Sequence, residues 1–516
     1  MKKRLLPLTV PGLSLRNVIL WNNSSCTHTK DYSFRFTPPF KIMALLIAVL
    51  FFTNCQKKGS PGAPVLSTSP SQIDLPAGGG TANLTINCNA QWNISNAASW
   101  LQLSKTSGNN DSSVITLTAG FNGTGSTRSV VLNINADNGQ ARRVTVSQGS
   151  QIYPSYNTSP KPSDSIGMST AVQLAAKFKL GWNIGNTMEA TGAETAWGNP
   201  LITESYVKYI KQLGFTSIRI PCAWDSHLDN KATAHIDPTW LNRVKDVVGY
   251  CVNNGMYVML NIHWDGGWLE NNITKVKQDS VSAKQKAFWE QIATAMRDFD
   301  EHLMFASANE PAADNADGMA VLAVYHQTFV NAVRSTGGKN SYRVLILQGP
   351  STSMSLTSQL MTTLPTDPTA NRLMVEIHNY TPAQFCFLNE DASWGKMFYY
   401  WGSGHHSTIE PDRNATWGEE DSHITDFNSM KTKFVDKGIP VLMGEYGAYR
   451  RDGTAHVPQD LPTHEASVDY WITFVTKQAL AHGIKPFWWD TGGAVDRQNN
   501  TIKDQRTIDA IIAGGQ

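Results

Sequence analysis

Residues 166–516 alternate between short apolar runs and longer stretches with helical periodicity. Strands of a parallel sheet are covered by helices on both faces, so they read as nearly continuous apolar runs. Repeated strand–helix units over about 350 residues predict an α/β fold, a closed (β/α)8 barrel. An open doubly wound sheet is the alternative, but no glycine-rich phosphate loop follows the first run. The expected strands are Gly181–Gly185, Ser217–Pro221, Tyr257–His263, Leu303–Ala308, Arg343–Gln348, Arg372–His378, Pro440–Gly444 and Ile484–Trp489.

Amphipathic segments between these runs are expected to form the helices of the barrel, because apolar residues recur there every three or four positions. The clearest are Glu204–Leu213, Trp240–Asn253, Ala283–Asp298, Val321–Arg334, Ile424–Asp436 and Val468–His482.

The preceding part of the chain has a different composition and predicts a separate domain. Residues 64–148 are rich in Ser, Thr, Asn and Gly and contain short runs of alternating polarity, such as Ala82–Ile86 and Arg143–Ser147. Such runs with turn residues between them predict a small immunoglobulin-like β-sandwich. Trp92 and Trp100 lie in strand-like patterns and are expected in its core. Residues 149–165, rich in Ser, Pro and Tyr, are expected to form a linker.

Residues 1–55 are expected to be an export segment. The apolar run Ile42–Phe52 follows Lys41 and has the length of a signal peptide, too short for a permanent membrane span. Cys55 directly after it resembles a lipobox, which implies a lipid anchor at this residue, although Asn54 departs from the usual small residue. A plain signal peptide and a translation start near Met43 are the alternatives. The protein is expected outside the cytoplasm, as a periplasmic or outer-membrane, cell-surface lipoprotein.

Charge and cysteine content exclude several classes of protein. With 43 Lys and Arg against 42 Asp and Glu, the net charge is +1, so neither a nucleic acid nor an acidic partner is indicated. The six cysteines are scattered, without a CxxC pair, so they predict neither a zinc site nor a disulfide framework. We expect a monomer that needs no metal or other cofactor.

Polar residues at the ends of the expected strands indicate the active site. In a (β/α)8 barrel the carboxyl ends of the strands meet at one mouth, where catalysis takes place. Two glutamates, two histidines, an arginine and aromatic residues gather there, namely Arg219, His263, Asn309, Glu310, His378, Tyr380, Glu445 and Trp489.

Two carboxylates with cationic and aromatic neighbours are the groups that glycoside hydrolysis needs. One must protonate the departing oxygen, which requires a raised pKa, and the other must be ionised to attack the anomeric carbon. A single glutamate at a strand end could equally form a salt bridge. The complete set is hard to explain as structural.

Residues 181–516 resemble glycoside hydrolase family 5, and its subfamily 4 in particular. The resemblance is carried by Gly181–Thr187, Glu194–Pro200, Asn309-Glu310-Pro311 and Gly444-Glu445-Tyr446-Gly447. Asn-Glu-Pro is a weak motif when it stands alone, but the ordered set is specific. Residues 64–148 resemble the BACON domain through segments such as Gln91–Ile94, a domain named for suspected carbohydrate binding. Because Trp92 and Trp100 are expected in its core, a spacer that holds the catalytic unit off the membrane is the preferred role.

The resemblance implies a role for each matching residue. Glu445 would be the nucleophile and Glu310 the acid/base of a retaining mechanism. Arg219 and Tyr380 would bond the nucleophile and favour its ionised form, and Asn309 would bond the sugar 2-hydroxyl. His263 and His378 would position the sugar hydroxyls and the acid/base, although His378 could instead be a histidine packed below the site. Trp489 would be the platform on which the sugar stacks, whereas its neighbour Trp488 would pack in the core.

Further tryptophans in loop-like stretches are candidates for stacking on neighbouring sugars. Trp268 and Trp394 are the main ones, with Trp197 and Trp417 beside them. The long segment 382–421, rich in aromatic residues, is expected to wall the cleft. Packing of these aromatics within the loop itself is the equally weighted alternative.

These observations together predict a retaining endo-β-1,4-glucanase whose substrate partner is a β-glucan polysaccharide. A xyloglucan-specific endo-β-1,4-glucanase is the alternative, since the resemblance covers both activities. A non-catalytic glycan-binding protein and a β-mannanase are the remaining alternatives. The presence of both glutamates argues against the binding protein, and the opening motif argues against the mannanase.

Overall fold

The computed structural model describes residues 62–516. The predicted export segment, including Cys55, lies outside the described residues. No helix within residues 62–516 has the length and apolar character needed to cross a membrane.

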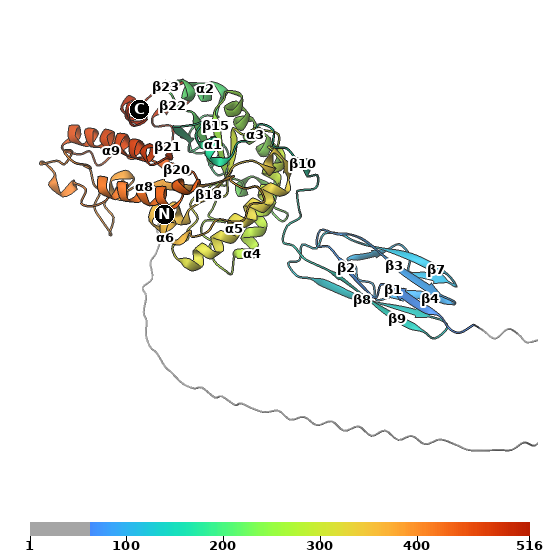
Figure 1. The fold of residues 1–516 in the computed structure, drawn as a ribbon. Helices are drawn as coiled ribbons and strands as arrows, with labels where there is room; N and C mark the ends of the chain where they lie inside the picture. Colours follow the sequence, from blue (N-terminus) through green and yellow to red (C-terminus); the bar gives the residue numbers. More distant parts are fainter. Residues whose placement is uncertain (1–61) are drawn as a thin grey trace, which may run out of the picture. The chain divides into compact units, whose positions relative to one another are not determined.

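Residues 66–148 form a β-sandwich, as predicted (Figure 1). One sheet has the strand order β1-β3-β7-β5 and the other β2-β9-β8-β4-β6. Most strand pairs are antiparallel, while β2 and β9 run parallel. The strands are β1 (Leu66–Ser69), β2 (Gln72–Leu75), β3 (Gly80–Cys88), β4 (Gln91–Ser95), β5 (Leu101–Leu103), β6 (Ser107–Asn109), β7 (Ser112–Ala119), β8 (Arg128–Ala136) and β9 (Ala141–Gln148).

Alternation of side chains explains why these polar segments fold. In β7, Ile115 and Leu117 are buried in the core between the sheets, whereas Val114, next to Ile115, is exposed. Trp92 is buried as predicted, and its indole nitrogen donates to Asp111 at 2.8 Å. The prediction for Trp100 was only partly right, because it lies half-buried in the turn before β5, under the guanidinium of Arg128.

Eight parallel strands close into a barrel, which confirms the predicted (β/α)8 fold. Each expected strand is present, although those ending at His263 and Ala308 stop two residues earlier, where the chain turns into the loops that carry the site. The barrel strands are β11 (Gly181–Ile184), β12 (Ser217–Ile220), β15 (Tyr257–Asn261), β16 (Leu303–Ala306), β18 (Leu345–Gln348), β19 (Leu373–Asn379), β20 (Val441–Tyr446) and β21 (Ile484–Asp490).

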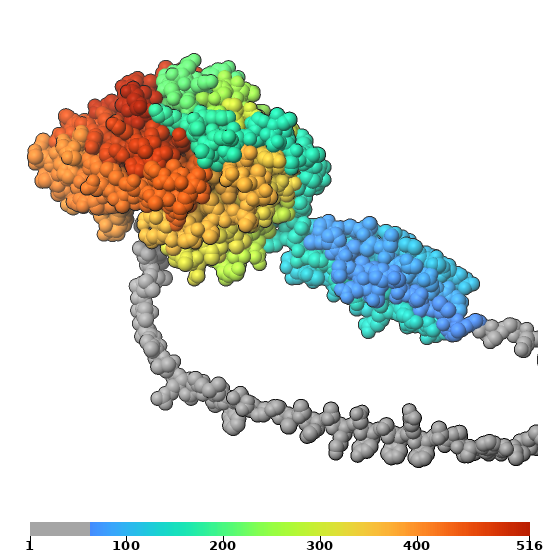
Figure 2. Space-filling view, in the orientation of Figure 1, coloured from blue at the N-terminus to red at the C-terminus, as the bar shows by residue number. Residues whose placement is uncertain are grey.

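Helices surround the barrel (Figure 1), and most begin at a capping side chain that accepts a backbone N–H. Asp237 caps α3, where Pro238 takes the first helical position. The second half of the chain, yellow to red, forms much of the barrel surface in Figure 2. The helices are α1 (Ala171–Ala175), α2 (Glu204–Gln212), α3 (Pro238–Asn253), α4 (Gln278–Ala295), α5 (Ala316–Ser335), α6 (Met354–Leu360), α7 (Ala383–Cys386), α8 (Glu420–Lys433), α9 (Leu461–Ala481) and α10 (Gln505–Gly514).

Short two-stranded pairs complete the fold. They are formed by β10 (Lys161–Ser163) with β17 (Gly337–Gly338), β13 (Leu228–Asn230) with β14 (His235–Ile236), and β22 (Val495–Asp496) with β23 (Thr501–Ile502).

The interior of the barrel changes from apolar to polar along the strands. Met304, Met374 and Phe487 pack with Leu174 and Phe178, which precede β11, in one apolar cluster. Nearer the carboxyl ends of the barrel strands, inward positions carry polar groups, and those of Asn183, Arg219, Gln348 and Glu376 are fully buried. A polar layer of this kind is stable only when its members bond one another, so it positions the site above it.

The second half of the expected linker is bonded to the barrel. The carboxylate of Glu290 on α4 accepts the backbone N–H of Tyr156 at 2.6 Å and the hydroxyl of Ser155 at 3.0 Å. Farther along, β10 pairs with β17. Sequence composition suggested a flexible segment here, and these long-range bonds show that part of it belongs to the barrel.

Candidate active site

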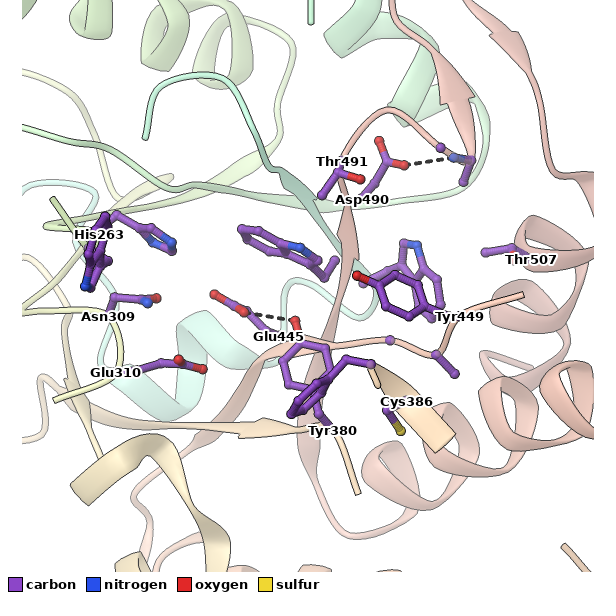
Figure 3. Close-up of a pocket in the computed structure, with 18 of the residues that line it drawn as sticks. His263, Asn309, Glu310, Tyr380, Cys386, Glu445, Tyr449, Asp490, Thr491 and Thr507 are labelled. Atoms are coloured by element: carbon purple, nitrogen blue, oxygen red, sulfur yellow. Dashed lines mark hydrogen bonds between the residues drawn. The ribbon is translucent and has the colours of Figure 1, made fainter. Parts of the chain in front are cut away.

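Two glutamates face one another at the mouth of the barrel (Figure 3). Glu310 follows β16 and Glu445 lies within β20. One carboxylate oxygen of each, together with a ring nitrogen of His378, lie within 4.8 Å of one another. Carboxyl groups about 5–5.5 Å apart allow direct attack on the sugar, whereas the inverting mechanism needs about 6.5–9.5 Å to accommodate a water molecule. The spacing therefore favours a retaining mechanism.

The carboxylate of Glu445 accepts hydrogen bonds from two side chains. Arg219 donates to its Oε1 at 2.7 Å, and the Tyr380 hydroxyl donates to its Oε2 at 2.9 Å. Burial, together with the charge of Glu445, raises the pKa of Tyr380 well above its usual value, so the phenol stays a donor. Both contacts predicted from the sequence are present.

Glu310 is bonded to His378, whose Nδ1 lies 2.8 Å from its Oε1. Burial alone would lower the pKa of His378, but the charge of Glu445 and the bonds to Glu310 and Glu376 raise it to about 9. Desolvation raises the pKa of Glu310, but the bond from His378 and the charges of His378 and Arg219 outweigh it. The pKa of Glu310 in the free protein is thus lowered, whereas a raised value was expected, because the protonated histidine is its direct partner.

Asn309, His263 and Trp489 complete the predicted set. Arg219 donates to Oδ1 of Asn309 at 2.7 Å, which fixes the amide and leaves its Nδ2 as a donor for a sugar hydroxyl. Burial and the charge of Arg219 lower the pKa of His263 to about 3, so this ring is neutral. The Trp489 ring lies nearly parallel to His263, at a centroid distance of 5.9 Å. Trp488 is buried against Tyr446, as expected.

Two cavities meet at the catalytic pair. The larger, of about 840 Å³, is lined by Glu445 and Glu310 and extends past Trp489 toward Tyr449 and Asp504. The smaller, of about 310 Å³, is lined by Glu310 and His378 and by the segment 351–355 with Trp417. Glu310 contacts both cavities, whereas Glu445 contacts only the larger one.

The structure separates the outlying tryptophans. Trp268 packs edge-on against Phe288 under the ammonium group of Lys284 and lines neither cavity, so its predicted stacking role is not supported. Trp394 is 61 % exposed and also lines neither cavity, and Trp197 is exposed as well. Trp417 lines the smaller cavity.

The aromatic run in segment 382–421 packs within the protein. Phe398, Tyr399, Tyr400 and Trp401 are buried, so this part of the loop does not offer them to the cleft. Phe387, near the start of the segment, is exposed and lines the larger cavity. Tyr399 and Tyr400 pack with Met397 within the segment, as in the alternative of a loop that packs on itself, whereas Phe398 and Trp401 belong to the barrel core.

Two buried glutamates beside the site were not predicted. Glu376 on β19 forms an ion pair with Arg219 and is bonded to His378. Glu270 lines the larger cavity, and no side chain in the described part of the chain donates a hydrogen bond to its carboxylate. A charged residue inside an apolar barrel strand was a usable signal for Glu376. Glu270 lies in a loop, where the sequence carried no such signal.

A metal ion could in principle be held by Glu310, His378 and Glu445, the one such group among residues 62–516. These groups bond one another and carry opposite charges, an arrangement suited to acid–base chemistry. The four cysteines of this region, Cys88, Cys222, Cys251 and Cys386, are free and buried.

Comparison with known families agrees with this geometry. Residues 183–495 match the model of the cellulase family, glycosyl hydrolase family 5. Because this match covers more than half of the chain, the protein belongs to glycosyl hydrolase family 5. Residues 90–149 match the BACON model, described as a putative N-terminal binding domain.

Particular relatives share one or both domains. A xyloglucan-specific endo-β-1,4-glucanase of Bacteroides ovatus is 31 % identical over 496 residues, which cover 92 % of this chain and 96 % of the relative. Endoglucanase A of Paenibacillus barcinonensis is 33 % identical over 378 residues, which cover 67 % of this chain and 90 % of the relative.

Solved structures give the same picture. The Bacteroides ovatus xyloglucanase in complex with a XXXG heptasaccharide aligns with a TM-score of 0.65 and 30 % identity, covering 87 % of this chain and 100 % of that one. XEG5B, a xyloglucan-specific β-1,4-glucanase from a ruminal metagenomic library, aligns with a TM-score of 0.62 and 39 % identity, covering 67 % and 96 %.

Proposed function

We propose that this protein is a retaining endo-β-1,4-glucanase that hydrolyses internal linkages of β-glucan polysaccharides. The observation that carries this proposal is the close pair Glu310 and Glu445 between two cavities. Chain ends are not required, because sugar units can occupy both sides of the pair at once.

The reaction proceeds in two steps on this geometry. Glu445, held by Arg219 and Tyr380, attacks the anomeric carbon and forms a covalent glycosyl-enzyme while Glu310 transfers a proton to the departing oxygen. Glu310 then takes a proton from water, which attacks the intermediate and releases the sugar. A bound glucan chain removes water from the cleft and thereby raises the pKa of Glu310, which prepares it for the acid step.

The two cavities can be assigned to the two parts of the substrate. Glu310 protonates the departing oxygen, and it lines both cavities, whereas Glu445 lines only the larger one. The sugar that becomes attached to Glu445 therefore lies in the larger cavity, over Trp489. The departing part lies in the smaller cavity, beside Trp417.

Xyloglucan is the second candidate substrate, and one observation favours it. A relative that matches across both domains is named a xyloglucan-specific enzyme, one solved structure is likewise named xyloglucan-specific, and another is named a xyloglucanase. Other structures of the same family, at similar identity, are named broad-specificity endoglucanases. The general glucanase activity is therefore our main proposal.

Reducing-sugar release from xyloglucan, barley β-glucan, carboxymethylcellulose and galactomannan tests the proposal. Activity on the β-1,4-glucans with none on galactomannan is expected. Highest activity on xyloglucan would support the xyloglucanase alternative, and no release from any substrate would refute the enzymatic function. Glu445→Gln should abolish turnover while retaining binding of the polymer, and unchanged turnover would refute the role of the nucleophile.

We also propose that the protein is exported and anchored by a lipid on Cys55, with the sandwich as a spacer. The apolar run before Cys55 supports export, and the burial of Trp92 leaves the sandwich without that ring as a sugar platform. Metabolic labelling with a fatty-acid analogue should mark the wild type but not Cys55→Ser, which should be released from the membrane fraction. Labelling that persists in the variant would exclude this anchor.

A further inference from the structure

Glu376 is a fully buried carboxylate that the two-step mechanism does not use. It lies on β19 at an inward position, two residues after Met374 and two before His378. An unpaired charge in a barrel interior is very unfavourable, so its partners should explain its presence.

Three side chains surround this carboxylate. Its Oε1 lies 3.0 Å from Nε of Arg219 and 3.2 Å from Nε2 of His378, and its Oε2 accepts from Nε2 of Gln348 at 2.5 Å. Arg219 is the residue that binds the nucleophile, and His378 is the residue that binds the acid/base. Glu376 is thus the group that contacts both supports of the catalytic pair.

The neighbouring strand β20 leaves space for the carboxylate because it carries a glycine there. A Cβ atom on Gly444 would lie 2.0 Å from Oε1 of Glu376, so no larger residue fits there while the carboxylate keeps its place. Gln348 is held in turn, because its Oε1 accepts from the hydroxyl of Ser307 at 3.0 Å and from the N–H of Ala308 at 2.9 Å. The orientation of Glu376 is therefore determined from several strands.

We propose that Glu376 is a positioning residue whose carboxylate is the counter-ion that lets Arg219 and His378 both be charged while Glu310 still holds its catalytic proton. This inference rests on the proposed hydrolytic function. With Glu310 protonated, the positive charges of Arg219 and His378 balance the negative charges of Glu445 and Glu376. Without Glu376 the cluster has an excess positive charge, which is relieved when Glu310 or His378 releases its proton.

The electrostatics of the site agree with this assignment. The charge of Glu376 raises the pKa of Glu310, and a hydrogen bond to Glu376 raises that of His378. The other titratable and charged groups that act on this cluster are Arg219, His263, Glu270, Tyr380 and Glu445. Of these, Arg219 and Glu445 carry the charges closest to Glu376 and His378.

The test compares the pH dependence of kcat/KM for Glu376→Gln and the wild type on barley β-glucan and on 2,4-dinitrophenyl β-cellobioside. For Glu376→Gln on β-glucan, the basic limb of the kcat/KM profile should move to lower pH by about one unit, and kcat/KM at neutral pH should fall about tenfold. The dinitrophenyl substrate, whose leaving group needs no proton, should lose much less. An unmoved basic limb, or equal losses on both substrates, would overturn the proposal.

Two further variants separate charge placement from folding. The double variant Glu376→Gln with Gln348→Glu keeps one negative charge in the cluster and restores a donor–acceptor pair, so it should fold and its basic limb should return toward the wild-type position. A folded double variant whose basic limb stays as displaced as that of Glu376→Gln would contradict the counter-ion role. Glu194→Gln is the matched control, since Glu194 is also buried and paired with an arginine, Arg243, and its pH profile should equal that of the wild type. An inactive wild type would instead refute the proposed function.

Discussion

At the scale of single residues, environment assigns different roles to identical side chains. Glu310 is bonded to His378. Glu376 contacts both Arg219 and His378, whereas Glu445 is bonded to Arg219 and Tyr380. Glu270 is the contrasting case, because burial and the charges of Asp265 and Glu310 raise its pKa to about 8. Backbone N–H groups of Glu270 and Asn309 offset this burial only in part, so the carboxyl group is most stable in its neutral form.

The titration of Glu270 should affect stability. Its folded pKa lies above the ordinary value of 4.5, so the folded state binds the proton more tightly and loses stability as pH rises from about 4.5 to about 8. Gln cannot ionise, so the Glu270→Gln variant does not lose this stability. The difference between its melting temperature and that of the wild type should therefore increase as pH rises from about 4.5 to about 8. At pH 8 the gain in unfolding free energy over the wild type should be about 4 kcal/mol. A difference that does not change with pH would contradict this account.

At the scale of elements, the loops after the barrel strands decide which aromatics reach the substrate. Trp394 and Trp417 lie in the same long segment and are both exposed, at 61 % and 48 %. Only Trp417 lines a cavity that includes Glu310. Exposure alone therefore does not identify a sugar platform, since the ring must also border the path of the chain.

Trp417→Ala should weaken cleavage of polymeric glucan by about tenfold in kcat/KM, because a flat ring that stacks on a departing sugar is lost. Trp394→Ala is the matched control and should stay within about threefold of wild type. Steady-state kinetics on barley β-glucan provide the measurement. The opposite ranking would show that the cleft continues along Trp394 rather than through the smaller cavity.

At the scale of the whole molecule, the barrel extends beyond its strand–helix repeats to residues near 155. Glu290 is buried and, besides Lys286 at 2.9 Å, has its partners in the segment before β10. A barrel that begins at Ser165 lacks those partners and also lacks β10. Removal of hydrogen bonds from a buried carboxylate leaves a desolvation cost that is not compensated.

A chain beginning at Gln151 should therefore be more stable than one beginning at Ser165, by about 1–3 kcal/mol. Thermal unfolding of the two chains measures the difference. Their kcat/KM values on β-glucan should agree at low temperature, because no residue of the segment 151–164 lines either cavity. Equal melting temperatures would restore the description of residues 149–165 as a simple linker.

Sequence alone was sufficient for the fold class, the eight strands and the placement of Glu310 and Glu445 together at the barrel mouth. Strands buried on both faces must be apolar, and the carboxyl ends of parallel strands meet at one mouth, so local patterns identify both. Arg219, Asn309, Tyr380 and Glu445 were placed together for this reason, and the structure brings them within hydrogen-bond distance. These predictions required only the order of elements along the chain.

Tertiary structure decided the features that depend on contacts between distant segments. Arg219 and Glu445 are 226 residues apart, and the links from Glu376 to Arg219 and Gln348 cross several strands, so no local pattern encodes them. The lowered pKa of Glu310, the packing of Trp268 against Phe288, the burial of Trp401, and the attachment of Tyr156 to Glu290 have the same origin. Composition and periodicity describe what one segment can do, whereas burial and charge pairing depend on which segments the closed barrel brings together.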